Sequence, residues 1–105
     1  MPFAQIGDLN LHYLERPGTG DPLLLIHGNT SSSVWWQYTI DRLADTSYHI
    51  IAPDLRGRGD TTGPDDAWTI ETLAADVFGL MQHLKLDAAH VVGHSLGGLV
   101  AVQYA

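Results

Sequence analysis

The sequence predicts an α/β fold: a mostly parallel sheet of about five strands that begins with an antiparallel hairpin and carries flanking helices. Two observations support this prediction. Three short apolar runs, at residues 23–26, 48–52 and 88–92, lack the alternation of a half-exposed strand, which is typical of parallel strands buried on both faces. Segments with helical periodicity separate these runs, and strands that alternate with helices form a parallel sheet with right-handed crossovers.

The N-terminal hairpin is predicted from residues 3–15. Apolar and polar side chains alternate there, with Leu9 and Leu11 among the apolar positions, and Gly7-Asp8 supplies a turn between two short strands. A dense cluster of turn-forming residues at 17–22 ends this unit. We therefore expect the hairpin to form an antiparallel edge of the sheet.

Three helices are predicted along the chain. The first follows the candidate N-cap residues 30–33 and has an apolar face made of Trp36, Ile40, Leu43 and Ala44. The second starts at Thr69 and has a sustained 3.6-residue period, with apolar positions Ile70, Leu73, Ala74, Val77, Leu80, Met81 and Leu84. The third starts at Leu96 and runs to Ala105. A glycine-punctuated loop at 54–64 connects the second buried strand to the second helix.

Composition limits the class of protein. The 105 residues are predicted to form a single domain, 1–105, with 45% hydrophobic and 16% charged residues. A net charge of −7 argues against nucleic acid or an anionic membrane as a partner. The chain has no cysteine, and no group of His, Asp or Glu has the sequence spacing of metal ligands, so we expect neither a metal nor another cofactor. Without a signal-peptide pattern or a bilayer-length apolar run, a cytoplasmic location is the default expectation.

The pattern G-x-S-x-G occurs at Gly93-His94-Ser95-Leu96-Gly97, between the third apolar run and the last helix. In this arrangement a strand turns sharply into a helix, and small residues two before and two after the serine relieve the crowding. The Ser95 hydroxyl then stands exposed, and the backbone N–H of Leu96 points to the same spot. The alternative is a glycine-rich turn that happens to contain a serine.

Two further segments should lie near Ser95. His27-Gly28-Asn29 and the loop after Pro53 both follow a predicted parallel strand. Ligands of open parallel sheets bind beyond the carboxyl ends of the strands. The predicted fold therefore gathers three polar segments at one edge of the sheet.

Three segments in this order resemble the α/β-hydrolase fold family: Leu25-Ile26-His27-Gly28-Asn29, Asp54-Leu55-Arg56-Gly57-x-Gly59, and Gly93-His94-Ser95-Leu96-Gly97-Gly98. The resemblance covers essentially the whole chain and implies the N-terminal half of that fold. It implies that Ser95 is a nucleophile and that the backbone N–H groups of Asn29 and Leu96 form an oxyanion hole. It further implies supporting roles for Gly28, Asp54, Gly93, His94 and Gly97.

The resemblance also implies a reaction class. Dehalogenase and epoxide-hydrolase relatives carry an aspartate where this chain has Ser95, so a serine implies hydrolysis of small-molecule esters or lactones. In the family, the carboxylate and histidine that complete the site follow the nucleophile, whereas this sequence ends ten residues after Ser95. The base that a serine needs must therefore come from elsewhere.

Candidates within the chain leave several roles open. His27 follows the strand next to that of Ser95 and is a candidate base, or else a support for the oxyanion loop. Asp54 could orient a base or fix its own loop. The aromatic side chains Trp35, Trp36 and Tyr38 could pack in the core or line an acyl pocket. By position, His12, His49, His83 and His90 are expected to be structural or solvated, whereas His94 could help to shape the turn.

The strand before Ser95 is expected to form an uncovered edge of the sheet. Exposed apolar edges pair with other chains, so we expect a homo-oligomer or a complementing chain that supplies the base. The alternative is a non-catalytic minimal module that binds small acyl compounds or only self-assembles.

Overall fold

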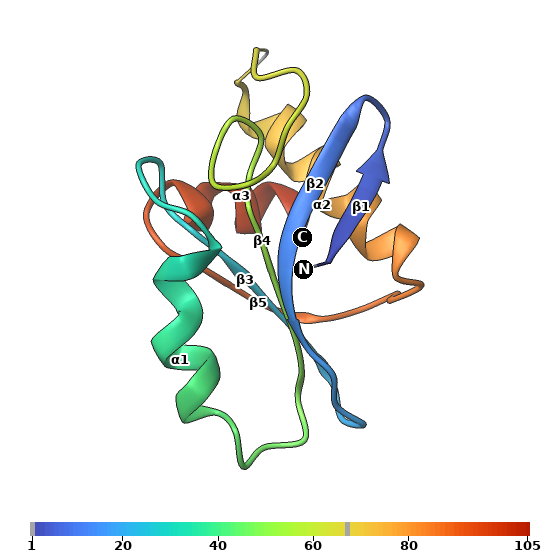
Figure 1. Cartoon of the computed structure of the whole chain (residues 1–105), viewed down its shortest axis with the longest axis vertical. Coiled ribbons are helices and arrows are strands. Elements are labelled where there is room, and N and C mark those ends of the chain that lie inside the picture. Colours follow the sequence, from blue (N-terminus) through green and yellow to red (C-terminus); the bar gives the residue numbers. More distant parts are fainter. Residues whose placement is uncertain (1, 67) are drawn as a thin grey trace.

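The computed structural model describes residues 2–66 and 68–105 and shows one five-stranded sheet in the order β1-β2-β4-β3-β5 (Figure 1). The strands are β1 (Phe3–Ile6), β2 (Leu9–Arg16), β3 (Pro22–Ile26), β4 (His49–Pro53) and β5 (His90–Gly93). The helices are the 3-10 helix η1 (Ser33–Trp36) and the α-helices α1 (Gln37–Arg42), α2 (Ile70–His83) and α3 (Leu96–Tyr104). None of the helices in these ranges has the length and apolar character to cross a bilayer.

The sheet is mixed, as the sequence predicts. Strands β1 and β2 form an antiparallel hairpin, and β2 pairs antiparallel with β4. Strands β4, β3 and β5 are parallel, with Leu24 of β3 opposite Ile51 on one side and Val91 on the other. The α/β fold class, the hairpin and the parallel strands are therefore confirmed.

Helices cover both faces of the sheet, so its central strands are buried on both sides. Helices α2 and α3 pack on one face, and η1 and α1 lie on the other (Figure 1). Leu24 and Ile26 of β3 belong to the larger core beneath α2 and α3, whereas Leu23 and Leu25 belong to the smaller core beneath η1 and α1. This two-sided burial explains why the run at 23–26 shows no polar alternation.

Helix α2 follows its predicted pattern. The Thr69 side chain caps its start by accepting a hydrogen bond from Thr72 N–H at 3.1 Å. The helix ends where Lys85 adopts a left-handed backbone, φ 61°, and the N–H of Leu86 returns to the carbonyl of Met81 at 2.9 Å. The apolar stripe between these ends is buried in the larger core, which ties α2 to the sheet.

The first helix is shorter than the sequence predicts. Helix α1 ends at Arg42, and Ala44, which we expected on its apolar face, is exposed. The carbonyls beyond the helix end are taken by other groups: the Arg16 guanidinium donates to Leu43 O at 2.9 Å and also to Ala44 O, and Thr46 Oγ1 donates to Leu43 O at 2.7 Å. Capping by a strand residue thus stops the helix early.

Strand β5 is also less buried than predicted. It begins at His90 rather than at residue 88, and Val92 is 44% exposed. Within residues 2–66 and 68–105, β5 pairs only with β3 and forms the edge of the sheet opposite β1. The expectation of an edge strand is confirmed, whereas the expectation of a strand buried on both faces is wrong.

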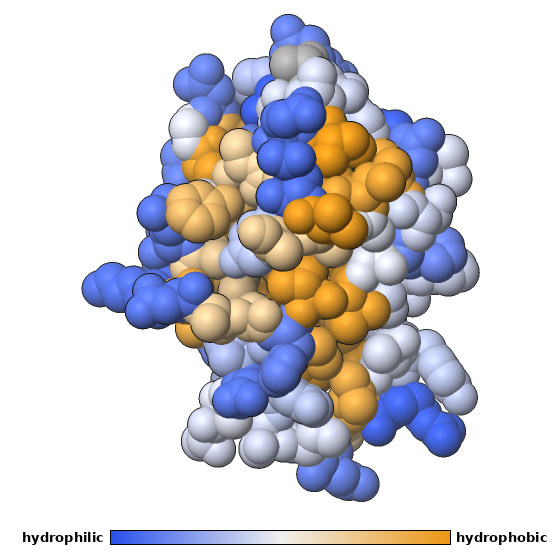
Figure 2. Space-filling model, turned by 180° about the vertical axis from the view of Figure 1, so that it is seen from behind, coloured by the Kyte–Doolittle hydropathy of each residue, from blue (hydrophilic) through white to orange (hydrophobic). Residues whose placement is uncertain are grey.

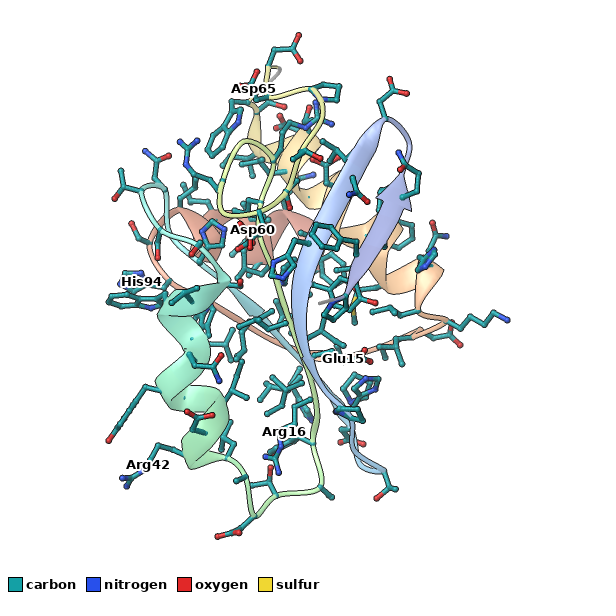
Figure 3. All side chains as sticks on the ribbon, in the orientation of Figure 1. Glu15, Arg16, Arg42, Asp60, Asp65 and His94 are labelled. Atoms are coloured by element: carbon teal, nitrogen blue, oxygen red, sulfur yellow. The ribbon has the colours of Figure 1, made fainter. Side chains whose placement is uncertain are left out.

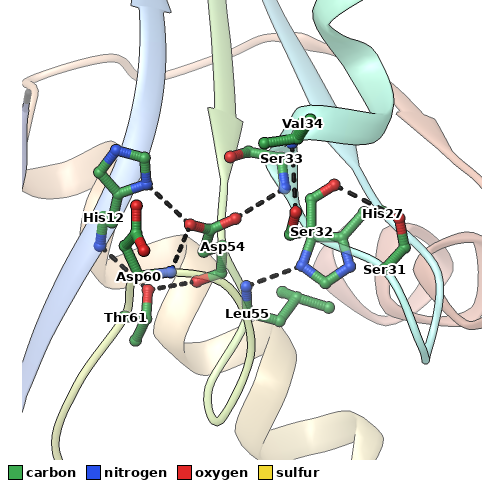
Figure 4. A network of polar contacts seen from close by, with 10 residues as sticks. All are labelled: His12, His27, Ser31, Ser32, Ser33, Val34, Asp54, Leu55, Asp60 and Thr61. Carbon is green, nitrogen blue, oxygen red and sulfur yellow. Dashed lines mark hydrogen bonds and ion pairs between the residues drawn. The ribbon is translucent and has the colours of Figure 1, made fainter.

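A buried carboxylate joins the segments at the carboxyl ends of the strands (Figure 4). Asp54 is 2% exposed. Its Oδ1 accepts a hydrogen bond from Ser33 N–H at 2.6 Å, and its Oδ2 accepts from His12 Nδ1 at 2.7 Å and from Asp60 N–H at 2.9 Å. One side chain therefore connects β2, the start of η1 and the loop that follows β4.

These hydrogen bonds determine the charge state of Asp54. Burial by itself raises the pKa of the carboxyl group, because it penalises the charged form. The donors Asp60 N–H, Ser33 N–H and His12 outweigh burial and hold the pKa below its usual value. The carboxylate is therefore charged in the folded protein and stabilises the loops that bond to it.

We expect Asp54→Asn to lower the free energy of unfolding at pH 7 by about 2 kcal/mol or more, because charged hydrogen bonds to buried donors are lost. The pKa of Asp54 is lower in the folded protein than in the unfolded chain. Its stabilisation is therefore complete above about pH 4, the usual value for an unfolded aspartate, and is lost as the pH falls through the folded-state pKa. Urea unfolding between pH 2 and 7 measures this difference.

The exposed Asp45 provides the matched control, since Asp45→Asn makes the same substitution at the surface. This variant should follow the wild-type curve within about 0.5 kcal/mol. The interpretation is wrong if the Asp54→Asn and wild-type curves run parallel down to pH 2.

Candidate functional site

Ser95 occupies the tight turn between β5 and α3. Its backbone has φ 56° and ψ −117°, an unusual conformation for a residue with a side chain. Such conformations cost roughly 1–3 kcal/mol and persist only where the surroundings enforce them. Ser95 is exposed, and its side chain stands at the N-terminus of α3.

Glycines on both sides of Ser95 make the turn possible. A Cβ on Gly93 would overlap the carbonyl of Gly97, and a Cβ on Gly97 would overlap the carbonyl of Ile26 on β3. The N–H of His94 also donates to Ile26 O at 3.0 Å. The backbone of the turn therefore packs directly against the backbone of β3, and this packing holds Ser95 in its unusual conformation.

The turn faces the loop after β3 across a pocket of about 270 Å³, lined by Gly28, Asn29, Thr30, Ser31, Trp35, His94 and Ser95. A Cβ placed on Gly28 would lie 3.2 Å from His94 Nδ1 and 3.5 Å from Ser95 Cβ, so glycine permits this close approach. The fold therefore brings Gly28, Asn29, His94 and Ser95 together, as the parallel sheet predicts.

The two adjacent tryptophans have different surroundings. Trp36 is 9% exposed and packs in the smaller core, whereas Trp35 is 55% exposed and lines the pocket. The Trp35 ring stacks on His94 with 4.8 Å between ring centroids and an interplanar angle of 26°. One wall of the pocket is therefore an aromatic pair contributed by η1 and the turn before α3.

His27 is fully buried, and both of its ring nitrogens are engaged; Figure 4 shows the bond to Leu55. Its Nε2 accepts a hydrogen bond from Leu55 N–H at 3.0 Å, which assigns the proton to Nδ1, and Nδ1 donates to Gly28 O at 2.6 Å. Burial lowers the pKa of His27 and favours the neutral ring that these bonds need. Neither nitrogen is left to take a proton from Ser95.

The bond from His27 has a consequence for Asn29. The carbonyl of Gly28 and the N–H of Asn29 belong to one planar trans peptide unit, so the two groups point in opposite directions. His27 Nδ1 and the N–H of Ser31, at 3.3 Å, both hold the Gly28 carbonyl. The Asn29 N–H is thereby directed away from His27.

The second expected donor lies at the start of α3. Leu96 is the first residue of this helix, and the first N–H groups of a helix have no partner within it. The Leu96 side chain packs partly against the larger core, whereas its backbone follows Ser95 directly. Both expected donors therefore belong to segments that the sheet holds in place.

Asp54 does not line the pocket but lies behind the loop that does. It forms a compact cluster with His12 and Asp60, although the sequence spacing indicated no such group. His12 Nδ1 contacts Asp54 directly at 2.7 Å, and each Asp54 oxygen already accepts a bond from the protein. The Asp54 carboxylate thus serves the protein's own hydrogen bonds, whereas His12 Nε2 is buried without a hydrogen-bond partner among the described residues.

Sequence reasoning missed the part played by Arg58. Its position predicts a residue of the glycine-punctuated loop, yet its side chain crosses to Asn29. The only sequence signal was an arginine between two glycines in a segment expected at the same edge of the sheet.

A family model described as alpha/beta hydrolase fold matches residues 21–105. Among curated proteins, a soluble epoxide hydrolase of Corynebacterium sp. (strain C12) is 41% identical over 102 residues, which cover 97% of this chain and 35% of that protein. An N-formylmaleamate deformylase of Pseudomonas putida is 36% identical over 95 residues, covering 90% of this chain and 35% of that protein. The chain thus spans about a third of the length of these curated relatives.

Solved structures agree with these similarities. The epoxide hydrolase CorEH superimposes with a TM-score of 0.91 at 40% identity and covers 99% of this chain and 36% of its own. Epoxide hydrolase A from Mycobacterium thermoresistibile gives a TM-score of 0.86 at 32% identity, covering 98% of this chain and 33% of its own. Because the family model matches most of the chain, at residues 21–105, the chain belongs to the alpha/beta hydrolase fold family.

Proposed function

We propose that this chain forms the nucleophile-bearing part of a serine hydrolase that acts on carboxylic esters or lactones. The observation that carries the proposal is the exposed Ser95, held at φ 56° between β5 and α3 and lining one pocket with Asn29. In the proposed reaction, Ser95 Oγ attacks the carbonyl carbon and its proton passes to a base. The carbonyl oxygen becomes an oxyanion that accepts hydrogen bonds from the Asn29 and Leu96 N–H groups.

The remaining steps complete the bond changes. The oxyanion collapses, the bond to the alcohol oxygen breaks, and the base returns the proton to that oxygen. Water then attacks the carbonyl carbon of the acyl-serine ester, and its proton passes to the base. The bond between that carbon and Ser95 Oγ breaks, the base returns the proton to Oγ, and the carboxylic acid leaves. In a lactone, the acid and the alcohol remain joined in one product.

The serine favours acyl substrates over the epoxides named for several relatives. A carboxylate that opens an epoxide forms an ester, which water can hydrolyse. A serine that opened an epoxide would instead form an ether, which has no carbonyl for water to attack. The similarity to a deformylase supports acyl chemistry in this family, since that name describes removal of a formyl group.

We propose that His27 is a positioning residue rather than the base. Its two nitrogens connect Leu55 to Gly28, and the Gly28 bond directs the Asn29 N–H. His12 offers no alternative, since it is 2% exposed and bonded to Asp54. The base is therefore proposed to come from a homo-oligomeric partner or a complementing chain that covers the edge of β5.

The surface around β5 supports such a covering partner. Figure 2, viewed from the side of α2 and α3, shows a band of hydrophobic side chains. The exposed apolar residues include Val92 on β5, Leu99 and Val102 on α3, and Phe78 on α2, with Val102 77% exposed. Helices that are apolar on several sides are usually buried in a larger structure.

A second candidate function is a non-catalytic module that binds small acyl compounds. The engagement of both His27 nitrogens favours it, because no hydrogen bond joins a histidine nitrogen to Ser95 within the described residues. Under this alternative, the pocket at Ser95 would bind acyl groups without turnover.

We expect a serine-reactive aryl phosphonate to label Ser95. An aryl ester of a short acid should be hydrolysed at least about 10³-fold faster than in water, the factor that donors and binding retain even without a base. Ser95→Ala should abolish labelling. His27→Ala should slow it by about 10²-fold, because one oxyanion donor loses its orientation. Intact-mass spectrometry and ester kinetics measure these effects.

Ser47 provides the matched control, as an exposed serine outside the pocket. Ser47→Ala should leave labelling unchanged. A wild-type chain that binds the aryl ester but neither hydrolyses it nor takes up the phosphonate would support the non-catalytic alternative instead.

Assembly is tested separately by sedimentation velocity at micromolar concentration. We expect a species larger than the 11.4 kDa monomer, because the apolar surface of β5 and α3 is buried between copies. Val102→Asp should shift the protein towards monomer, whereas Val34→Asp, which places the same charge at a comparably exposed valine on η1, should not. A stable wild-type monomer would exclude the homo-oligomer.

A further inference from the structure

The Arg58 side chain bridges the loop after β4 and the loop after β3. Its Nε donates to the backbone carbonyl of Asn29 at 2.5 Å, and a terminal nitrogen donates to Asn29 Oδ1 at 3.1 Å. The other terminal nitrogen donates to the carbonyl of Gly57 at 3.0 Å. All three guanidinium nitrogens are therefore bonded, two of them to Asn29.

The arginine is itself held in place. Its guanidinium lies over the Trp68 ring, 4.0 Å from the ring centroid, in a cation–π contact. Its backbone N–H donates to Leu55 O at 2.9 Å, and its carbonyl accepts from Thr61 N–H at 3.2 Å. Gly57 and Gly59, on either side, have φ of 72° and 53°, so the backbone turns tightly around Arg58. These contacts hold the planar guanidinium fork of Arg58 in place without a bound ligand.

The bonds of Arg58 complement those of His27. His27 holds the carbonyl of Gly28, which belongs to the peptide unit that contains the Asn29 N–H. Arg58 holds the carbonyl of Asn29, which belongs to the next peptide unit. Fixing both planar units fixes the φ and ψ of Asn29 between them. Neither contact alone does so.

We propose that Arg58 is a positioning residue that orients the Asn29 N–H towards the carbonyl oxygen of an acyl substrate at Ser95. The inference rests on the proposed function for the role of that N–H as an oxyanion donor. The orientation itself is a separate claim about the loop. A planar fork suits this task, because two parallel donors fix direction as well as distance, which a lysine ammonium cannot do.

The orientation is tested by amide ¹⁵N relaxation on the full chain. In the wild type, the Asn29 and Thr30 amides should have order parameters near 0.85, the value for rigid backbone, and Arg58→Ala should lower them below about 0.6. Arg58→Lys keeps the charge but loses the fork, so it should resemble Arg58→Ala rather than the wild type.

Arg42 provides the matched control, because Arg42→Ala removes the same charge and side chain. Figure 3 places Arg42 at the opposite end of α1 from His94, and its contact is with the Tyr38 ring. This variant should keep wild-type order parameters at Asn29. The amides of β3 and β4 should be unchanged in every variant, which shows that each one folds.

The functional arm measures phosphonylation of Ser95 in the same variants. Arg58→Ala and Arg58→Lys should each slow it by about 10-fold or more, and on an aryl ester the loss should fall on kcat with KM nearly constant, because the donor acts in the transition state.

The two arms separate failure of this inference from failure of the proposed function. If the wild type takes up no phosphonate, the relaxation data alone decide: disorder at Asn29 in Arg58→Ala supports the positioning role. Unchanged order parameters in Arg58→Ala overturn it. Disorder at Asn29 with undiminished phosphonylation also overturns it, since the orientation would then have no effect on Ser95.

Discussion

The buried carboxylate of Asp54 is the interaction on which the arrangement of the site depends. It accepts hydrogen bonds from β2, from the start of η1 and from its own loop. The bond from Ser33 N–H anchors the far end of the segment that begins at Gly28. The bond from Asp60 N–H anchors the loop that contains Arg58. A charge far from water is tolerated here because each oxygen meets a donor. The pocket at Ser95 is thus shaped by a residue that does not line it.

Two further side chains, His27 and Arg58, connect the loops that Asp54 holds to the pocket at Ser95. His27 bonds to the carbonyl of Gly28, and Arg58 bonds to the carbonyl of Asn29. The loop after β4 supports both side chains, because Leu55 N–H bonds to His27 and the turn at Gly57 contains Arg58. A donor held in this way needs no reorganisation when charge develops on a substrate oxygen. The loop after β4 therefore supports the Asn29 N–H, the proposed donor, which lies in the loop after β3.

The sequence predicted the features that depend on local periodicity. The hairpin, the parallel strands, α2 and the meeting of Gly28, Asn29 and Ser95 followed from apolar patterns and from the shared edge of parallel strands. The end of α1 did not, because Arg16 caps it from 27 residues away. The environment of His27 depends on Leu55, 28 residues along the chain. Such pairings have no signature in spacing, so the alternatives for His27 and the bonds of Arg58 required the structure.

The close packing behind the turn at Ser95 also positions α3, the helix that carries exposed apolar side chains. Packing Gly97 against the carbonyl of Ile26 forces the turn and brings α3 over the sheet edge. The same packing leaves Leu99 and Val102 facing outward. Because the contacts that hold the strained turn lie within β3, β5 and α3, the proposed nucleophile and its donors can be ordered before any covering partner is present. A partner at β5 would then add a base to a pocket that is already formed, so acyl binding and proton transfer should be separable properties of the assembly.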